Sequence, residues 1–238
     1  MTALMRGELI KAATTRTWLA YTALGVVLAA ATVIIGSLTT DVVRVSDKQG
    51  VISGWPVVLL LFGLVGAAGE YRHRTAAPAA LVAGRDRGVL LLARMGAYAL
   101  AGLAVATLMT AVSLALGLPL LSGEPGPGLG AGDVVAVAGG SLVAAALSAT
   151  MGVAVGALLR NQVAGVVGAL ILAFVVTPLL TTISETAQEY TPIGAAVVLA
   201  GALDGEALSW FAAALLLAAW TVALVVVAIV AERRRDLA

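Results

Sequence analysis

Six long apolar stretches dominate this sequence and limit the folds that it can form. They are residues 18–38, 51–68, 90–121, 134–159, 163–182 and 208–231. A helix that crosses a bilayer needs about 20 predominantly apolar residues, and each stretch comes close to that length or exceeds it. Only 11% of the residues are charged, which is too few to give six such helices the polar outer faces of a soluble bundle. We therefore predict an all-α integral membrane protein with six transmembrane helices in a single domain, residues 1–238.

Lysine and arginine are distributed unevenly between the segments that join these stretches. If the N-terminus is placed inside the cell, only Arg44 and Lys48 of the 14 basic residues fall in outer segments. Basic residues concentrate on the cytoplasmic side of membrane proteins, so the distribution predicts that both termini are cytoplasmic. The same rule accounts for Arg94, Arg160 and residues 233–235, which we expect to fix the topology and to contact anionic lipid.

The segments outside the six stretches are expected to differ in structure. Residues 1–17 mix charged and apolar residues, and they predict an N-terminal helix in the inner headgroup region, here called the elbow helix. Residues 41–50 form a short polar link, whereas residues 122–133 are rich in Gly and Pro and predict an irregular turn. Residues 183–207 begin polar and then turn apolar over too short a run to span. They predict a small helix or a re-entrant segment at the outer face.

Most of the chemistry that would identify an enzyme or a metal site is missing. The sequence has no Cys and no glycine-rich phosphate loop. Ser141 has no base close to it in the chain, because the only histidine, His73, lies in another segment. Glu185 and Glu189 stand four residues apart, but without further acids or histidines we expect them to be solvated surface. The chain is therefore predicted to be no enzyme by itself and to bind neither a cofactor nor a metal.

No ionisable residue lies near the middle of any of the six stretches. Ion-coupled carriers and charge-selective channels usually keep such groups inside the membrane, so both classes are disfavoured. Energy for transport would then have to enter from outside the membrane domain. Small residues fill the stretches instead and allow helices to approach closely, with packing inside one bundle favoured over a subunit interface. The motifs are Gly152-x-x-x-Gly156, Gly63-x-x-Gly66 and Gly165-x-x-Gly168.

The densest cluster of charge lies in residues 69–88, between the second and third stretches. Topology explains why this segment is basic, but a simple inner turn needs only a few residues. Thr75 can cap a helix, Pro78 suits its first turn and Gly84 suits its end. We therefore predict a short helix along the inner membrane face, flanked by charge on both sides, which docks a cytoplasmic partner.

The residues around this segment resemble a known family. The pattern consists of Glu70, Tyr71, Arg72, Thr75, Leu81, Arg87 and Arg94. It is similar to the loop between the second and third spans in permease subunits of type-2, export-class ABC transporters. Two positions depart from that family pattern, because Arg74 stands at a frequent Gly and Gly84 at a frequent Pro.

The resemblance extends over the whole chain. The stretch "ELIKAATTRTW" looks like the N-terminal elbow helix of those permeases. The stretch "GALLRNQVAGVVGAL" is similar to their short inner turn between spans four and five, and "YTPIGAA" is similar to the outer segment before their last span. Each of these motifs is short, so the resemblance rests on their order along the chain and on the six-span topology.

The resemblance implies a transporter of several subunits in the bacterial plasma membrane. Two permeases, identical or paralogous, would pair within membrane lipid above two cytoplasmic ABC ATPase subunits. ATP and magnesium would bind to those ATPases, and nucleic acid is not an expected partner. The short loop helix would be the coupling helix, and the implied substrate of the exporter is lipophilic or amphiphilic. The residues expected to couple to the ATPase are Glu70, Arg72, Arg74, Thr75, Arg85 and Arg87.

Two other functions stay open from the residues alone. The first is a structural or regulatory polytopic membrane protein that uses the charged segment to dock a different cytoplasmic partner. The second is a membrane enzyme acting on lipid. Such an enzyme would need a cluster of acids or histidines at one face, which the sequence does not supply.

Overall fold

The chain folds into helices, as the apolar stretches predict. The computed structural model describes residues 2–39, 43–72, 86–203, 205 and 207–234. It is 85% helical, and the described residues contain no strand. Six of its helical segments are long and apolar enough to cross a membrane, and each coincides with one of the six stretches to within a few residues, apart from the start of the second. The prediction of an all-α protein with six membrane-length helices is therefore confirmed.

The helical elements follow one another in a simple order. The N-terminal half contains α1 (Thr2–Thr14), α2 (Arg16–Thr39), α3 (Val45–Val51), α4 (Pro56–Arg72) and α6 (Arg87–Leu121). The C-terminal half contains α7 (Ala131–Leu159), α8 (Gln162–Ile171), a π-helical segment (Leu172–Val176), α9 (Thr177–Leu179), 3₁₀ turns (Leu180–Thr182 and Ala187–Tyr190), α10 (Pro192–Leu199) and α11 (Trp210–Arg234).

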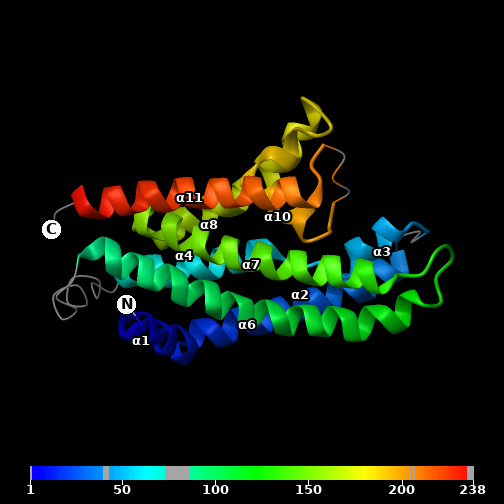
Figure 1. Ribbon diagram of the computed structural model, residues 1–238, viewed down its shortest axis with the longest axis horizontal. Helices are drawn as coiled ribbons and strands as arrows, with labels where there is room; N and C mark the ends of the chain where they lie inside the picture. Colours follow the sequence, from blue (N-terminus) through cyan, green and yellow to red (C-terminus); the bar gives the residue numbers. More distant parts are fainter. Residues whose placement is uncertain (1, 40–42, 73–85, 204, 206, 235–238) are drawn as a thin grey trace.

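The long helices run side by side along the longest axis of the molecule (Figure 1). Helices α4 and α7 form the centre of the bundle, with α6 and α11 packed on α7 and α2 packed on α6. The segment 162–182, together with α2 and α11, exposes many large apolar side chains. Such surfaces suit a bilayer, because lipid tails are as apolar as the side chains that face them.

Glycines allow the two central helices to approach each other. A Cβ atom added to Gly152 would lie 2.0 Å from the carbonyl oxygen of Leu60, and one added to Gly156 would lie 2.6 Å from that of Leu64. On the facing side, a Cβ at Gly63 would lie 2.1 Å from the carbonyl oxygen of Ala149. The prediction that these glycines pack within one bundle is confirmed. Gly168 differs, because nothing lies within 4 Å of its added Cβ.

The two ends of the bundle differ in charge. One end, here called the basic end, contains α1, the end of α4, the start of α6 and the end of α11 (Figure 1). The opposite end, here called the distal end, contains α3 and the turn between α6 and α7 (Figure 1). Arg44 and Lys48 belong to the distal end, where they border and form part of α3.

The prediction of a short polar link at residues 41–50 is partly wrong, because helix α3 forms within this segment. Lys48 on α3 is only 1% exposed, and its Nζ donates to the backbone carbonyl oxygen of Glu124 at 3.3 Å. The neighbouring Gln49 donates to Asp133 Oδ1 at 3.1 Å. Lys48 therefore contacts the turn after α6, and Gln49 contacts the first turn of α7. These contacts hold α3 against the bundle, although polar residues in a short link are expected to be exposed to solvent.

The second membrane segment is broken near its distal end. Helix α3 ends at Val51, and α4 begins only at Pro56, later than the expected start at residue 51. Proline suits the first turn of a helix, but it has no N–H to bond the carbonyl oxygen four residues earlier. Residues 52–55 therefore cross this level of the bundle without helical structure.

The segment 183–207 contains the small helix that its sequence predicts. Helix α10 packs against α4, α7 and α11, and most of its side chains are buried. The expectation that Glu189 is solvated is wrong, since it is only 3% exposed. Its carboxylate accepts hydrogen bonds from the backbone N–H groups of Ala207 and Leu208, at 3.2 and 2.9 Å to Oε2. This pairing ties the chain before α11 to the segment before α10, whereas Glu185 is exposed.

Candidate functional site

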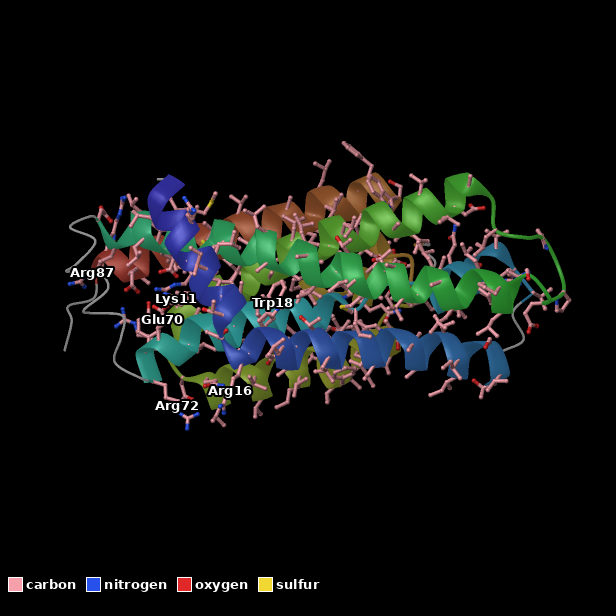
Figure 2. All side chains as sticks on the ribbon, turned by 90° about the horizontal axis from the view of Figure 1, so that it is seen from below. Lys11, Arg16, Trp18, Glu70, Arg72 and Arg87 are labelled. Carbon is pink, nitrogen blue, oxygen red and sulfur yellow. The ribbon has the colours of Figure 1, made fainter. Side chains whose placement is uncertain are left out.

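Helix α1 lies across the basic end of the bundle (Figure 2). The helical path breaks at Thr15, so α1 turns away from α2 and packs on α6. Trp18, just after the break, packs edge-on against Phe62 with 6.0 Å between ring centroids. Glu8 and Lys11 stand one turn apart on α1 and form an ion pair at 2.8 Å. Both side chains therefore occupy the same face of the helix.

Four charged side chains from three helices meet beneath α1, and they are called here the α1 cluster: Glu8, Lys11, Glu70 and Arg94. Glu70, near the end of α4, pairs with both Lys11 and Arg94. Arg94 Nε also donates to Glu8 Oε2 at 3.2 Å. Figure 2 shows Lys11 and Glu70 facing each other where α1 crosses the bundle. The cluster thereby joins α1 to the two helices that flank residues 73–85.

Arg94 is the buried centre of this cluster. Its side chain is 3% exposed although it lies on a membrane-length helix. A buried guanidinium requires charged partners, and its planar group can bond two carboxylates at once. The expectation that Arg94 contacts anionic lipid is therefore wrong. Two acids on separate elements neutralise it inside the protein, a pairing that no local pattern reveals.

A second group of side chains lies beside the α1 cluster and joins α4 to α11. The Tyr71 hydroxyl donates to Glu232 Oε2 at 3.0 Å, and Arg160 Nη2 donates to the same oxygen at 3.0 Å. The Arg160 guanidinium also lies over the Tyr71 ring, 4.9 Å from its centroid. Arg160 ends α7 in a left-handed conformation, with φ of 51°. Arg160 therefore makes contacts inside the bundle that its sequence position did not predict, while 26% of its side chain stays exposed.

Glu70 and Tyr71 are consecutive residues, so one turn of α4 engages both groups. Through Glu70 it is tied to α1 and α6, and through Tyr71 it is tied to α11 and to the end of α7. At the start of α6, Asp86 accepts from the Gly88 N–H at 2.7 Å and pairs with Arg233 at 3.4 Å. That last pair is half-exposed and contributes little to stability.

The six residues expected to contact an ATPase are only partly described. Arg74, Thr75 and Arg85, together with the predicted coupling helix, lie outside the described residues. Arg72 ends α4 and is exposed, whereas Arg87 begins α6 and is partly buried. Figure 2 shows both at the basic end, outside the α1 cluster. Glu70 is 11% exposed, and its described contacts are directed to α1 and α6.

The remaining candidate chemistry has a structural explanation where it is described. Ser141 is buried, and its Oγ accepts from the Gly54 N–H at 3.0 Å and donates to the Ala200 carbonyl oxygen at 3.4 Å. It therefore links the break before α4 to the end of α10. Within the described ranges, no three His, Cys, Asp or Glu residues gather where they could hold a metal ion.

Several contributors to this site were not assigned a role from the sequence. Glu232 and Tyr71 are the clearest, since their contact joins positions separated by most of the chain. Acidic residues are rare in this sequence. An acidic residue in the last turns of a membrane-length helix is therefore the one sequence signal that could have identified Glu232. Comparisons with protein-family models and with curated proteins found no match for this chain.

Proposed function

We propose that this chain is the membrane-spanning permease subunit of an ATP-driven ABC exporter. In this proposal the basic end faces the cytoplasm, as the distribution of Lys and Arg favours. A separate ATPase binds residues 69–88, and a second permease, identical or paralogous, completes the membrane part. The cargo is lipophilic or amphiphilic, in keeping with spans that carry no ionisable residue near their middle.

The observation that carries the proposal is the pair of contact groups at the basic end. Helix α4 leads into residues 73–85 and α6 leads out of them, and both helices are bonded to α1 through Glu70 and Arg94. Tyr71 extends the connection to α11 and α7. A force applied to the intervening segment would therefore act on most of the bundle together. Such a connection is what a transporter needs if its energy arrives through a cytoplasmic loop.

Glu70 has a different role in this proposal from the one that its position in the sequence suggests. Its carboxylate pairs with Lys11 and Arg94, so it joins α1 to α4 and α6. Removing it would disturb α1 as well as any docking surface. Arg72 and Arg87, together with Arg74, are better test positions, because none of them is one of the four residues of the α1 cluster.

The test is to purify the full chain from its native membranes in mild detergent and to identify the proteins that remain bound. We expect an ATPase that contains a phosphate loop, and we expect its ATP hydrolysis to change when the permease is bound. The triple variant Arg72→Ala, Arg74→Ala, Arg87→Ala should lose that ATPase. Arg233→Ala, an exposed basic residue on α11 at the same end, is the matched control and should keep it.

The opposite results are equally clear. A stable complex that contains cytoplasmic proteins but no ATPase would refute the proposal and would favour a structural or regulatory role. Retention of an ATPase with unchanged turnover in the triple variant would leave a permease but would remove these arginines from coupling.

A further inference from the structure

A half-open cavity of about 250 Å³ lies near the distal end of the bundle. Thr32 of α2, residues 53–57 at the break before α4, Ala173 and Phe174 of the π-helical segment, and Val197 of α10 line it. It is called here the distal cavity. A helix rises about 1.5 Å per residue, so Thr32 lies roughly 10 Å inside the end of α2 at Thr39. The cavity is therefore at the level of the apolar spans.

Two irregular pieces of backbone meet at this cavity. One is the break at residues 52–55, and the other is the π-helical segment Leu172–Val176. Non-helical backbone at membrane depth is tolerated where it is buried in protein or lines a cavity, and π-helical turns are frequent at functional sites. Both irregularities cost regular hydrogen bonding, and both border the same space.

The lining is mostly apolar but contains one hydroxyl without a partner. Ser53 is 4% exposed, and its Oγ makes no hydrogen bond to any residue in the described part of the chain. By contrast, the other polar side chains at the lining are satisfied. Trp55 Nε1 donates to Thr32 Oγ1 at 2.9 Å, and Thr32 itself donates to the carbonyl oxygen of Leu28 at 2.9 Å. The enclosed polar side-chain atoms without a partner in the described residues are Thr22 Oγ1 and Arg160 Nε, so the Ser53 hydroxyl is instead open to the cavity. It can therefore donate to or accept from an occupant.

The volume limits the occupant further. An apolar cavity of about 150 Å³ holds benzene, and ligand pockets for drug-sized molecules begin at about 300 Å³. A half-open cavity between these sizes fits one or two fused rings and does not enclose a whole phospholipid. Phe174 at the lining is 59% exposed on the outer surface of the bundle. This position gives a route of entry from the surrounding bilayer.

We propose that the distal cavity binds an uncharged, ring-containing lipophilic molecule that carries one hydroxyl or carbonyl group bonded by Ser53. Aromatic and apolar side chains provide the contact area, and the Ser53 hydroxyl selects the polar substituent. Because the described lining residues all belong to one chain, binding can be tested without a second permease or an ATPase. The ligand site can therefore be refuted independently of the transport function proposed above.

The test uses the full chain in phosphatidylcholine nanodiscs with 2-naphthol as the probe and a diazirine derivative of it for photolabelling. Labelled peptides are mapped by mass spectrometry. We expect saturable labelling of the segments that contain Trp55 and Phe174. Unlabelled 2-naphthol should compete about three- to ten-fold better than naphthalene, because one hydrogen bond to the hydroxyl is gained. In Ser53→Ala that difference should disappear.

Matched variants separate occupancy from folding. Ala173→Phe fills the cavity from the π-helical segment and should abolish the specific labelling. Val175 lies on the same segment but does not line the cavity, and it is 55% exposed. The variant Val175→Phe should therefore be labelled as strongly as the unchanged protein. Val197→Phe fills the cavity from α10 and is the second test if Ala173→Phe does not elute as a folded protein.

Labelling that persists in a folded variant with a filled cavity overturns the proposal. Equal competition by naphthalene and 2-naphthol also overturns it, since that result indicates a purely apolar occupant such as an acyl chain.

Discussion

A close helix contact at the centre of the bundle predicts the effect of a single methyl group. In Gly152→Ala, the added Cβ would lie 2.0 Å from the carbonyl oxygen of Leu60 and 2.9 Å from the backbone nitrogen of Leu64. Ordinary contacts of a Cβ atom begin at about 3.4 Å. Helices α4 and α7 must therefore separate by more than about 1 Å, because the obstructing atoms belong to backbone and cannot rotate away.

The expected cost follows from this geometry. Overpacking a well-packed core costs about 1–3 kcal/mol, and a rigid backbone obstacle puts this site in the upper half of that range. The gain in helix propensity from Gly to Ala offsets up to about 1 kcal/mol. We expect a net loss of roughly 1–2 kcal/mol in the free energy of unfolding, or about five- to thirty-fold in the unfolding equilibrium. Tryptophan fluorescence during SDS titration in mixed micelles measures this difference.

A second glycine on the same helix is the control. Gly139 also lies on α7, but nothing lies within 4 Å of its added Cβ. Gly139→Ala should therefore be neutral or should stabilise the protein by up to about 1 kcal/mol. If Gly152→Ala unfolds at the same SDS fraction as Gly139→Ala, the close approach of α4 and α7 is not what stabilises the centre of the bundle.

Three further predictions concern the charged and capped positions. Arg94→Ala removes the buried cation between Glu8 and Glu70, which then share Lys11, and should cost about 3–5 kcal/mol in the same unfolding assay, whereas Arg233→Ala should cost under about 1 kcal/mol. Lys48→Ala releases the turn after α6 and should speed its cleavage by protease added to the purified protein, whereas Arg44→Ala, which is exposed, should not. Glu189→Ala leaves the N–H groups before α11 without an acceptor, costs about 1–3 kcal/mol, and should speed hydrogen exchange there.

Each of these expectations has a result that contradicts it. Equal unfolding of Arg94→Ala and Arg233→Ala would mean that the α1 cluster adds nothing to stability. Unchanged cleavage in Lys48→Ala would mean that its bond to the turn does not hold it in place. Unchanged exchange before α11 in Glu189→Ala would assign that protection to packing against α10 instead.

The candidate site was only partly accessible from the sequence. Arg72 and Arg87 were expected in the segment 69–88, and they lie in its helical flanks, at the end of α4 and the start of α6. Their coupling role stays a prediction. The partners of Arg94 and Arg160 were missed, because Glu8, Glu70 and Glu232 come from distant parts of the chain. Glu189 was misjudged for the same reason, since its partners follow α10 rather than neighbouring it in sequence.

The sequence by itself determined the long helices of this protein, but not α3 or the break before α4. Hydropathy and length are local properties, so six membrane-length helices, the small helix before α11 and the turn after α6 could all be derived from residue order. Tertiary structure alone decided which helices meet and which charges are neutralised inside the bundle. The approach of Gly152 to α4 and the burial of Arg94 beneath α1 each depend on two elements at once. A local sequence pattern cannot identify such a partner, because the contact forms only after the helices have packed.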